Sequence, residues 1–294
     1  MILCVGDILV DMFGAPKGDA ITFDAHAGGA AFNVAVNVKQ SGAKVGFVGR
    51  VGDDLLGKFL KEQAGKVRFD YLDIQTDKVR NTTVAYVTVV DGERDFTFSR
   101  HDTTDYNIDV KEIDFGKYGK IDLLLMGSTM LSEPYGRKVA KKLFKKAKSL
   151  SIKVAFDVNF RLDMYEDFNQ AVIAYKPYVE NADVVKFSND ELTMYTGIED
   201  IDQAANMLVK KDQLLVVTCG ANGSKFYYNG LSKLVPTEKL TPVDTTGAGD
   251  AFFGKLLSEL ENKEWTEEVL ENALAKANAF GARATQFVGA IKID

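Results

Sequence analysis

The chain of 294 residues is poor in cysteine, lacks long apolar runs and carries no excess of positive charge. Cys4 and Cys219 each lie in an apolar, strand-like run, which predicts reduced core thiols rather than a disulfide or a metal pair. The formal net charge of −6 argues against a general surface for nucleic acid or an anionic membrane. No run is long enough to span a bilayer, and Asp7 and Asp11 interrupt the N-terminal apolar stretch, so a signal peptide is not expected. We therefore expect a cytoplasmic protein.

Repeats and Pro/Gly/Ser-rich linkers are also missing, which favours one main domain over residues 1–294. Buried-strand patterns recur at 2–5, 45–48, 121–126, 154–157, 183–187 and 214–218. Helical patterns at 54–63, 137–150, 169–179 and 203–210 separate many of them. This alternation predicts an α/β fold with a doubly wound, mainly parallel sheet and helices on both faces. Ligands of such sheets bind at the carboxyl ends of the strands.

One helical segment is locally basic. It carries six lysines between Lys138 and Lys148, but Val139, Leu143 and Ala147 form an apolar stripe on its opposite side. This pattern is typical of a solvated helix face. It gives no reason to expect a nucleic-acid partner.

One region breaks the strand–helix alternation. Two strand-like runs in 82–100 flank Asp91-Gly92, which is a strong hairpin signal. The segment 10–24 adds further strands beside it in this interpretation. A small sheet set apart from the core would serve as a lid or a dimer surface, or it would be an edge hairpin without a function.

The stretch "DTTGAGDAFFGKLL" places small residues directly before a helix pattern. Backbone N–H groups at Gly247, Ala248 and Gly249 would be unshielded there and would form an anion site. Asp250 follows at once, although a carboxylate repels the anion that such a site attracts. Taken alone, Asp250 is equally explained as an acidic residue that complements the helix dipole.

A second glycine-rich stretch, "HAGGAAFNVAVNVKQSG", also precedes a helix pattern. Gly28 and Gly29 allow close backbone approach to a ligand, Asn33 offers a donor and an acceptor, and Asp11 offers carboxylate acceptors. Each residue alone is explained by turns and caps. Together with the anion site, they indicate one neutral, hydroxyl-rich substrate beside one substrate that carries phosphate.

These two stretches resemble the motifs of the ribokinase-like carbohydrate kinases, the PfkB family. "GGAAFNVA", followed by Gly42 and Gly52, resembles the N-terminal motif, and "DTTGAGD" resembles the C-terminal motif. The likeness runs from Ile2 to Ile291. The segments "GERDFTFSR", "FDVNFR", "ADVVKFSNDEL" and "VVTCGANGS" look most like those of bacterial fructokinases.

The resemblance implies an ATP-dependent kinase and gives the first stretch a role. Gly247, Ala248 and Gly249 would form the anion hole for the transferring phosphoryl group, because fixed backbone donors need no reorganisation. Asp250 would accept the proton of the attacking sugar hydroxyl. Other implied sugar ligands are Asp11, Gly28, Gly29, Asn33, Arg100, Asn159 and Arg161.

Further implied residues serve the nucleotide and the ions. Lys186, Thr218, Gly220, Gly223 and Asn278 would lie along ATP. Glu191 would help to position Mg²⁺ through water, and Asp244 would support a monovalent cation such as K⁺. A surface position remains the alternative for Lys186 and Asn278, and a structural ion pair remains the alternative for Arg100 and Arg161.

Some positions depart from the family pattern. Lys255 stands where the C-terminal motif prefers Ala or Gly, and it is expected either to extend outward or to help neutralise phosphate. Ser188 replaces the asparagine of an Asn-x-x-Glu motif. "RLDMY" replaces the Leu-Trp ending often found after the arginine, which leaves this pocket wall undefined.

The best interpretation is a homodimeric sugar kinase that phosphorylates fructose at its 6-hydroxyl, with the lid at the dimer interface. A 2-keto-3-deoxygluconate kinase is the nearest rival, because two arginines suit a carboxylate. A nucleoside kinase is disfavoured, since no aromatic box for a base stands out in the hairpin beyond Phe96 and Phe98. A non-catalytic sugar sensor would not need Asp250, and a Rossmann dehydrogenase would need a G-x-G-x-x-G after the first strand.

Overall fold

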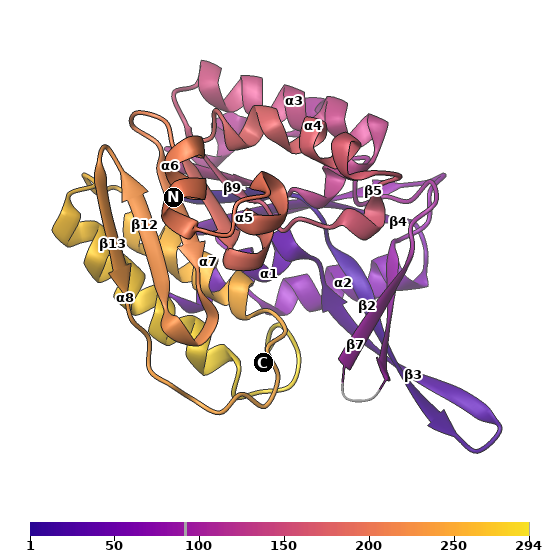
Figure 1. The fold of residues 1–294 in the computed structure, drawn as a ribbon. Coiled ribbons are helices and arrows are strands. Elements are labelled where there is room, and N and C mark those ends of the chain that lie inside the picture. Colours follow the sequence, from indigo (N-terminus) through magenta and orange to yellow (C-terminus); the bar gives the residue numbers. More distant parts are fainter. Residues whose placement is uncertain (91–92, 294) are drawn as a thin grey trace.

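The computed structural model describes residues 1–90 and 93–293, without the side chains of 16, 88–90 and 93–96. Its main sheet has nine strands in the order β13-β12-β11-β10-β9-β8-β1-β4-β5 (Figure 1). The strands are β1 (Ile2–Val5), β4 (Val45–Gly52), β5 (Tyr71–Asp77), β8 (Leu123–Met126), β9 (Lys153–Asp157), β10 (Val184–Ser188), β11 (Leu214–Thr218), β12 (Ser224–Tyr228) and β13 (Leu231–Val235). All neighbours are parallel except β11–β12 and β12–β13.

Two apolar clusters cover the two faces of this sheet. Side chains alternate between them, so that Leu3 and Val5 face one cluster while Ile2 and Cys4 face the other. The first cluster packs under α3 (Pro134–Ser149), α4 (Phe168–Val179), α5 (Asn189–Thr196) and α6 (Ile201–Leu208). The second packs under α1 (Ala30–Gln40), α2 (Leu55–Lys66), α7 (Ala248–Leu260) and α8 (Glu267–Ala284). The predicted doubly wound α/β fold is confirmed.

Local sequence signals account for the element boundaries. The strands expected at 2–5 and 214–218 have these bounds in the structure, and the other expected strands shift or extend by one to four residues. The Asp54 side chain caps α2 by accepting a hydrogen bond from the Gly57 N–H, which fixes the start expected there. The basic helix is α3, and Val139, Leu143 and Ala147 are buried as predicted.

A separate four-stranded sheet has the order β3-β2-β6-β7. It is built from β2 (Leu9–Lys17), β3 (Ala20–Gly28), β6 (Val84–Val90) and β7 (Glu93–Ser99). The β2–β3 hairpin extends away from the body of the molecule at the lower right of Figure 1. This sheet joins the two segments that the sequence set apart, although the predicted turn at Asp91-Gly92 and the Phe96 side chain lie outside the described part. In the described residues no helix is long and apolar enough to cross a membrane.

Candidate active site

Two pockets meet at the carboxyl ends of the central strands. One is lined by residues from β11, α7 and α8, and the other by residues that follow β1, β8 and β9. Gly249 belongs to the walls of both pockets. A group held in one pocket can therefore reach a group held in the other across this single residue.

The loop before α7 has a backbone that only glycine fits easily. Gly247 has a φ of 74°, and an added Cβ would lie 2.6 Å from the backbone of Ala290. Helix α7 begins at Ala248, whose N–H donates a hydrogen bond of 3.2 Å to the Thr245 carbonyl oxygen, and the N–H groups of Gly249 and Asp250 follow in the first turn at the junction of the pockets. This loop holds the residues that are predicted to form the anion site, and it is named the anion loop below (residues 247–249).

Asp250 points from the first turn of α7 into the second pocket. The Asn33 amide, on α1, donates a hydrogen bond of 2.9 Å from Nδ2 to Asp250 Oδ2. Burial, followed by the negative charge of Asp157, raises the pKa of the Asp250 carboxyl to about 7. A carboxylate with this pKa is well matched to accept a proton near neutral pH.

A buried ion pair lies beneath the anion loop. Lys186 Nζ is 2.9 Å from Asp157 Oδ1 and 3.0 Å from Oδ2, and both residues are buried. A Cβ on Gly249 would lie 3.3 Å from Lys186 Nζ. Burial alone would lower the pKa of Lys186, but Asp157 and Glu191 outweigh it and raise that pKa. The lysine therefore stays positive directly under the site where an anion would bind.

Asp157 was not predicted as a site residue. It is the last residue of β9, and burial raises the pKa of its carboxyl to about 6 against the opposing charge of Lys186. Its place at the carboxyl end of a predicted strand is the signal that could have found it. The pairing partner is 29 positions away, so only the fold brings the two together.

The second pocket is rich in polar side chains. Of the predicted sugar ligands it contains Asp11, Gly29, Asn33, Arg100, Asn159 and Arg161, together with Lys186, Gly247 and Asp250. Asn159 has a φ of 39°, an uncommon backbone conformation that asparagine tolerates better than most residues. Six of the seven sugar ligands that the resemblance implied thus line this pocket.

Gly28 and Gly29 serve this pocket through the space that they leave. A Cβ on Gly28 would lie 2.1 Å from Asp11 Oδ2, so only glycine lets the Asp11 carboxylate occupy its position. Gly29 has a φ of 110°, and a Cβ there would lie 2.7 Å from the Asp7 carbonyl oxygen. Gly28 itself is not among the residues that line the pocket.

Asp7 is a second buried carboxylate that the sequence reasoning did not assign. It follows β1, and its Oδ2 accepts a hydrogen bond of 2.7 Å from the Ala30 N–H at the start of α1. Burial, together with the nearby charge of Asp105, raises the pKa of Asp7. Asp7 therefore caps α1, the helix that presents Asn33 to Asp250.

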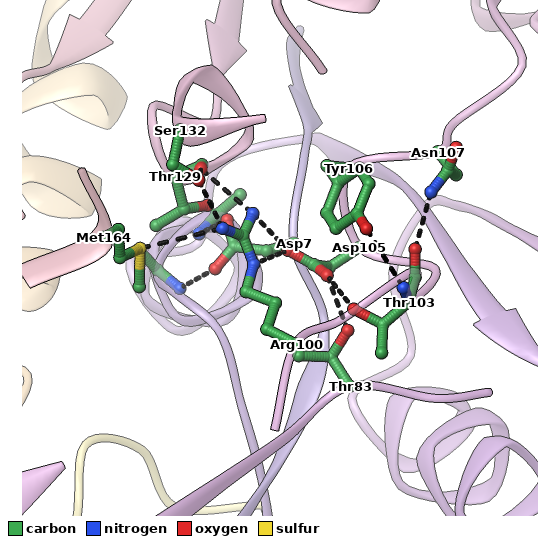
Figure 2. A network of polar contacts seen from close by, with 12 residues as sticks. Asp7, Thr83, Arg100, Thr103, Asp105, Tyr106, Asn107, Thr129, Ser132 and Met164 are labelled. Carbon is green, nitrogen blue, oxygen red and sulfur yellow. Dashed lines mark hydrogen bonds and ion pairs between the residues drawn. The ribbon is translucent and has the colours of Figure 1, made fainter. Parts of the chain in front are cut away.

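Arg100 lies at the pocket wall with its guanidinium already bonded (Figure 2). Its Nε donates to Asp105 Oδ2 at 2.7 Å, and its Nη2 donates to the Thr129 carbonyl oxygen at 3.0 Å. Its Nη1 contacts the Ser132 hydroxyl and the Met164 sulfur. All three guanidinium nitrogens thus hold protein acceptors. A sugar that binds Arg100, as predicted, would have to share these N–H donors with the protein acceptors.

The first pocket contains most of the predicted nucleotide residues, namely Thr218, Gly220, Gly223 and Asn278, with Ala248 and Gly249. Lys186 is not among them, because it lies on the other side of the anion loop. The Asn278 amide donates a hydrogen bond of 2.8 Å to the Val235 carbonyl oxygen. It therefore braces the chain after β13 at the pocket wall.

The two predicted ion-binding residues, Glu191 and Asp244, both accept hydrogen bonds from backbone N–H groups. Glu191 forms a capping box with Ser188, and its second carboxylate oxygen accepts a hydrogen bond of 2.9 Å from the Phe160 N–H. Asp244 accepts hydrogen bonds from Thr246 and from the Gly289 N–H. Neither residue lines either of the two pockets, and no group of three or more metal-ligating side chains occurs in the described part of the chain.

Lys255 extends away from the anion loop. Its Nζ lies 2.7 Å from Glu259 Oε1, one turn further along α7, and Lys276 of α8 binds the same carboxylate. Partial burial would raise the pKa of Glu259, but hydrogen bonds from Lys255 and Lys276 lower it to about 2. Of the two expectations for Lys255, the structure supports the outward one.

Comparisons with known proteins agree with this geometry. Residues 1–293 match the family model described as pfkB family carbohydrate kinase. A fructokinase of Vibrio alginolyticus is 34% identical over 292 residues, which cover 97% of this chain and 93% of the relative.

Solved structures show the same likeness. The fructokinase of Xylella fastidiosa with bound ATP superposes with a TM-score of 0.90 at 28% identity, covering 98% of this chain and 93% of that one. The fructokinase of Vibrio cholerae O395 with fructose, ADP and calcium bound has a TM-score of 0.88 at 30% identity, covering 99% and 94%.

Proposed function

The chain belongs to the pfkB family of carbohydrate kinases, and on this premise we propose that it transfers the γ-phosphoryl group of ATP to the 6-hydroxyl of fructose. The observation that carries the proposal is the wall shared by the two pockets. Gly249 separates a pocket with few charges from a polar one, and Asp250 stands on the polar side of it. Relatives with ATP or with fructose and ADP bound support the same assignment.

The proposed reaction uses groups that are already in place. The Asp250 carboxylate accepts the proton of the sugar hydroxyl as its oxygen attacks the γ-phosphorus, and the bond to the β-phosphate oxygen of ATP breaks. The N–H groups of the anion loop and the Lys186 ammonium stabilise the negative charge on the transferring group. The products are the sugar phosphate and ADP, with the proton left on Asp250.

Mg²⁺ is part of the proposal. Glu191 is the candidate for holding it, and both of its carboxylate oxygens already accept backbone hydrogen bonds. This donor set fits a cation that keeps its waters and binds mainly to phosphate oxygens, as Mg²⁺ does. When bound, the ion would neutralise phosphate charge. A K⁺ site at Asp244 stays a prediction, which rate measurements with K⁺ exchanged for a larger organic cation would check.

The charges of the polar pocket favour a neutral sugar over a sugar acid. Its lining carboxylates are Asp7, Asp11, Asp105, Asp157 and Asp250. The five carboxylates stand against three cations in the lining, Arg100, Arg161 and Lys186, of which Arg100 pairs with Asp105 and Lys186 with Asp157. A carboxylate substrate would face net repulsion without a new bidentate partner. We therefore rank fructose above 2-keto-3-deoxygluconate.

A sugar-panel assay with ATP and Mg²⁺ tests the proposal. We expect kcat/KM to be larger for fructose than for 2-keto-3-deoxygluconate or ribose, with fructose 6-phosphate as the product. A larger value for the keto acid would replace fructose with the rival substrate. Saturable fructose binding without any turnover would instead indicate a sugar sensor.

The four-stranded sheet is proposed as a lid that also joins two copies of the chain. Phe23 and Tyr86 pack edge to face at 5.5 Å between ring centroids, yet both remain exposed, as does Ile21. Large apolar side chains gathered on one sheet face are typically covered in solution. We expect light scattering to give the mass of a dimer at micromolar concentration, and Phe23→Asp to give a monomer. A monomeric parent protein would contradict the dimer while leaving the lid proposal in place.

A further inference from the structure

Asp105 is a buried carboxylate at the junction between the lid sheet and the polar pocket (Figure 2). It is 1% exposed and belongs to the loop between β7 and the short 3-10 helix Val110–Glu112. Its Oδ2 lies 2.7 Å from both Nε and Nη2 of Arg100. Its Oδ1 accepts hydrogen bonds from the hydroxyls of Thr83 and Thr103, at 2.5 and 3.1 Å. Both oxygens of the Asp105 carboxylate thus accept hydrogen bonds from neighbouring side chains.

Two of these neighbours, Thr83 and Arg100, lie directly beside the ends of lid strands. Thr83 directly precedes β6, and its carbonyl oxygen accepts a hydrogen bond of 3.1 Å from the Val10 N–H of β2. Arg100 directly follows β7. The Asp105 carboxyl group therefore bonds directly to residues that adjoin β6 and β7, and it is linked to β2 through Thr83.

The same carboxyl group reaches the pocket wall through Arg100. The guanidinium contacts Thr129, Ser132 and Met164, and the first and last of these line the polar pocket. Its Cζ also lies 5.0 Å from the centroid of the Tyr106 ring. Since these contacts come from loops of the main domain, the Asp105–Arg100 pair connects the lid with the pocket.

We propose that Asp105 is a positioning residue that fixes the ends of the lid strands relative to the sugar pocket. It acts through Arg100 and Thr83 and does not itself carry out chemistry. The inference rests on the proposed function, in which a sugar binds in this pocket. Without the Asp105 charge, the buried Arg100 cation loses the carboxylate with which it pairs, and the ends of β6 and β7 lose their common anchor.

Loss of this anchor has a specific kinetic signature. A loosened lid admits water to the phosphoryl group and closes less well over the sugar. The nucleotide pocket lies beyond the anion loop and shares none of these contacts. We therefore expect the KM for the sugar and the ATP hydrolysed per sugar phosphate to rise, while the KM for ATP stays within about twofold, a change below about 0.4 kcal/mol.

The test compares Asp105→Asn with Asp102→Asn as a matched control. Asp102 lies in the same loop and pairs with Arg80 at 2.7 Å, but its side chain is 63% exposed. For Asp105→Asn we expect the sugar KM to rise by about tenfold or more, in view of the cost of breaking a buried ion pair. The control should stay within about twofold of the parent protein, as is usual for a surface ion pair.

Hydrogen exchange of the lid amides gives a readout that needs no substrate. Amides of 84–87 and 97–99 should exchange faster in Asp105→Asn than in the parent protein, whereas those of β9 and β10 should not. Thr83→Val removes one bond of the anchor and leaves the Arg100 pair, so it should show a smaller effect of the same kind. If Asp105→Asn does not fold, Thr83→Val decides the question.

A lowered melting temperature with unchanged lid exchange and sugar KM would overturn the proposal, because Asp105 would then be merely structural. Unchanged lid exchange in a folded Thr83→Val would overturn it as well. A parent protein that phosphorylates no sugar would instead refute the proposed function, and the exchange measurement would still test the anchor.

Discussion

The two pockets that meet at Gly249 differ in chemistry. The polar pocket is lined by aspartates, by Arg100 and Arg161 and by Lys186, whereas the charged side chain in the lining of the other pocket is Glu238. The nucleotide pocket is instead walled by residues such as Ala221, Leu240, Pro242 and Phe252, and by backbone. The sugar would thus be recognised through directed hydrogen bonds, and the nucleotide through the shape of its pocket and through main-chain donors.

This difference teaches where substitutions should matter. A site built from buried charges loses much when one partner is removed, because the other charge is left without compensation. A site built from apolar contacts and backbone loses less with any one side chain. We therefore expect large effects on the sugar side of the anion loop and modest ones on the nucleotide side.

The largest effect is expected for Asp250→Asn. The amide cannot accept the hydroxyl proton, so kcat should fall by roughly 10²–10⁴ or more, the usual scale for loss of a general base. Because Asp250 lies on the sugar side, ATP affinity measured by calorimetry should be unchanged. Near-normal turnover of the purified variant would contradict the assignment of Asp250 as the base.

Lys186→Met should come next. It removes the positive charge beneath Gly249 and leaves Asp157 without its partner. We expect kcat to fall by about 10²–10³, as for the loss of a donor to a developing negative charge. Lys255→Met is the matched control, since that ammonium pairs with Glu259 away from the loop. Equal losses of kcat in Lys186→Met and Lys255→Met would show that the position of the positive charge next to the anion loop does not matter.

A smaller effect is expected in the pH profile. Since Asp250 acts as carboxylate and its pKa is raised to about 7, kcat/KM should fall as the pH drops below 7 and level off above about 8. Asp157→Asn removes a negative charge that raises this pKa and leaves Lys186 unpaired, and both changes stabilise the Asp250 carboxylate. The acid limb should therefore move to lower pH. A shift to higher pH in a rate–pH titration would contradict this electrostatic account.

The smallest effect is expected on the nucleotide side. Asn278→Ala removes a hydrogen bond to the Val235 carbonyl oxygen, so the wall after β13 should loosen. We expect the KM for ATP to rise by a few-fold, up to about tenfold, as for the loss of one buried hydrogen bond. The sugar KM should not change. A loss in kcat as large as that of Lys186→Met would remove the distinction between the two pockets.

Sequence patterns alone determined much of this protein. The strand and helix alternation gave the doubly wound sheet, because periodicity follows directly from which faces are buried. The anion loop, Asp250 and Asn33 were also singled out as candidates, because glycine spacing before a helix has a local physical meaning, and the structure brings Asn33 and Asp250 together. Sequence reasoning likewise separated the lid segments, although it did not show that β2 pairs in parallel with β6.

Only the tertiary structure decided how the charges are paired. Asp157 with Lys186 and Asp7 with the start of α1 join residues far apart in the chain, and no local pattern marks such partners. The same holds for Arg100, whose guanidinium is bonded to Asp105 and to the loop at Thr129. A residue type shows which bonds a side chain can make, whereas burial and distance, which arise on folding, decide which of them it makes.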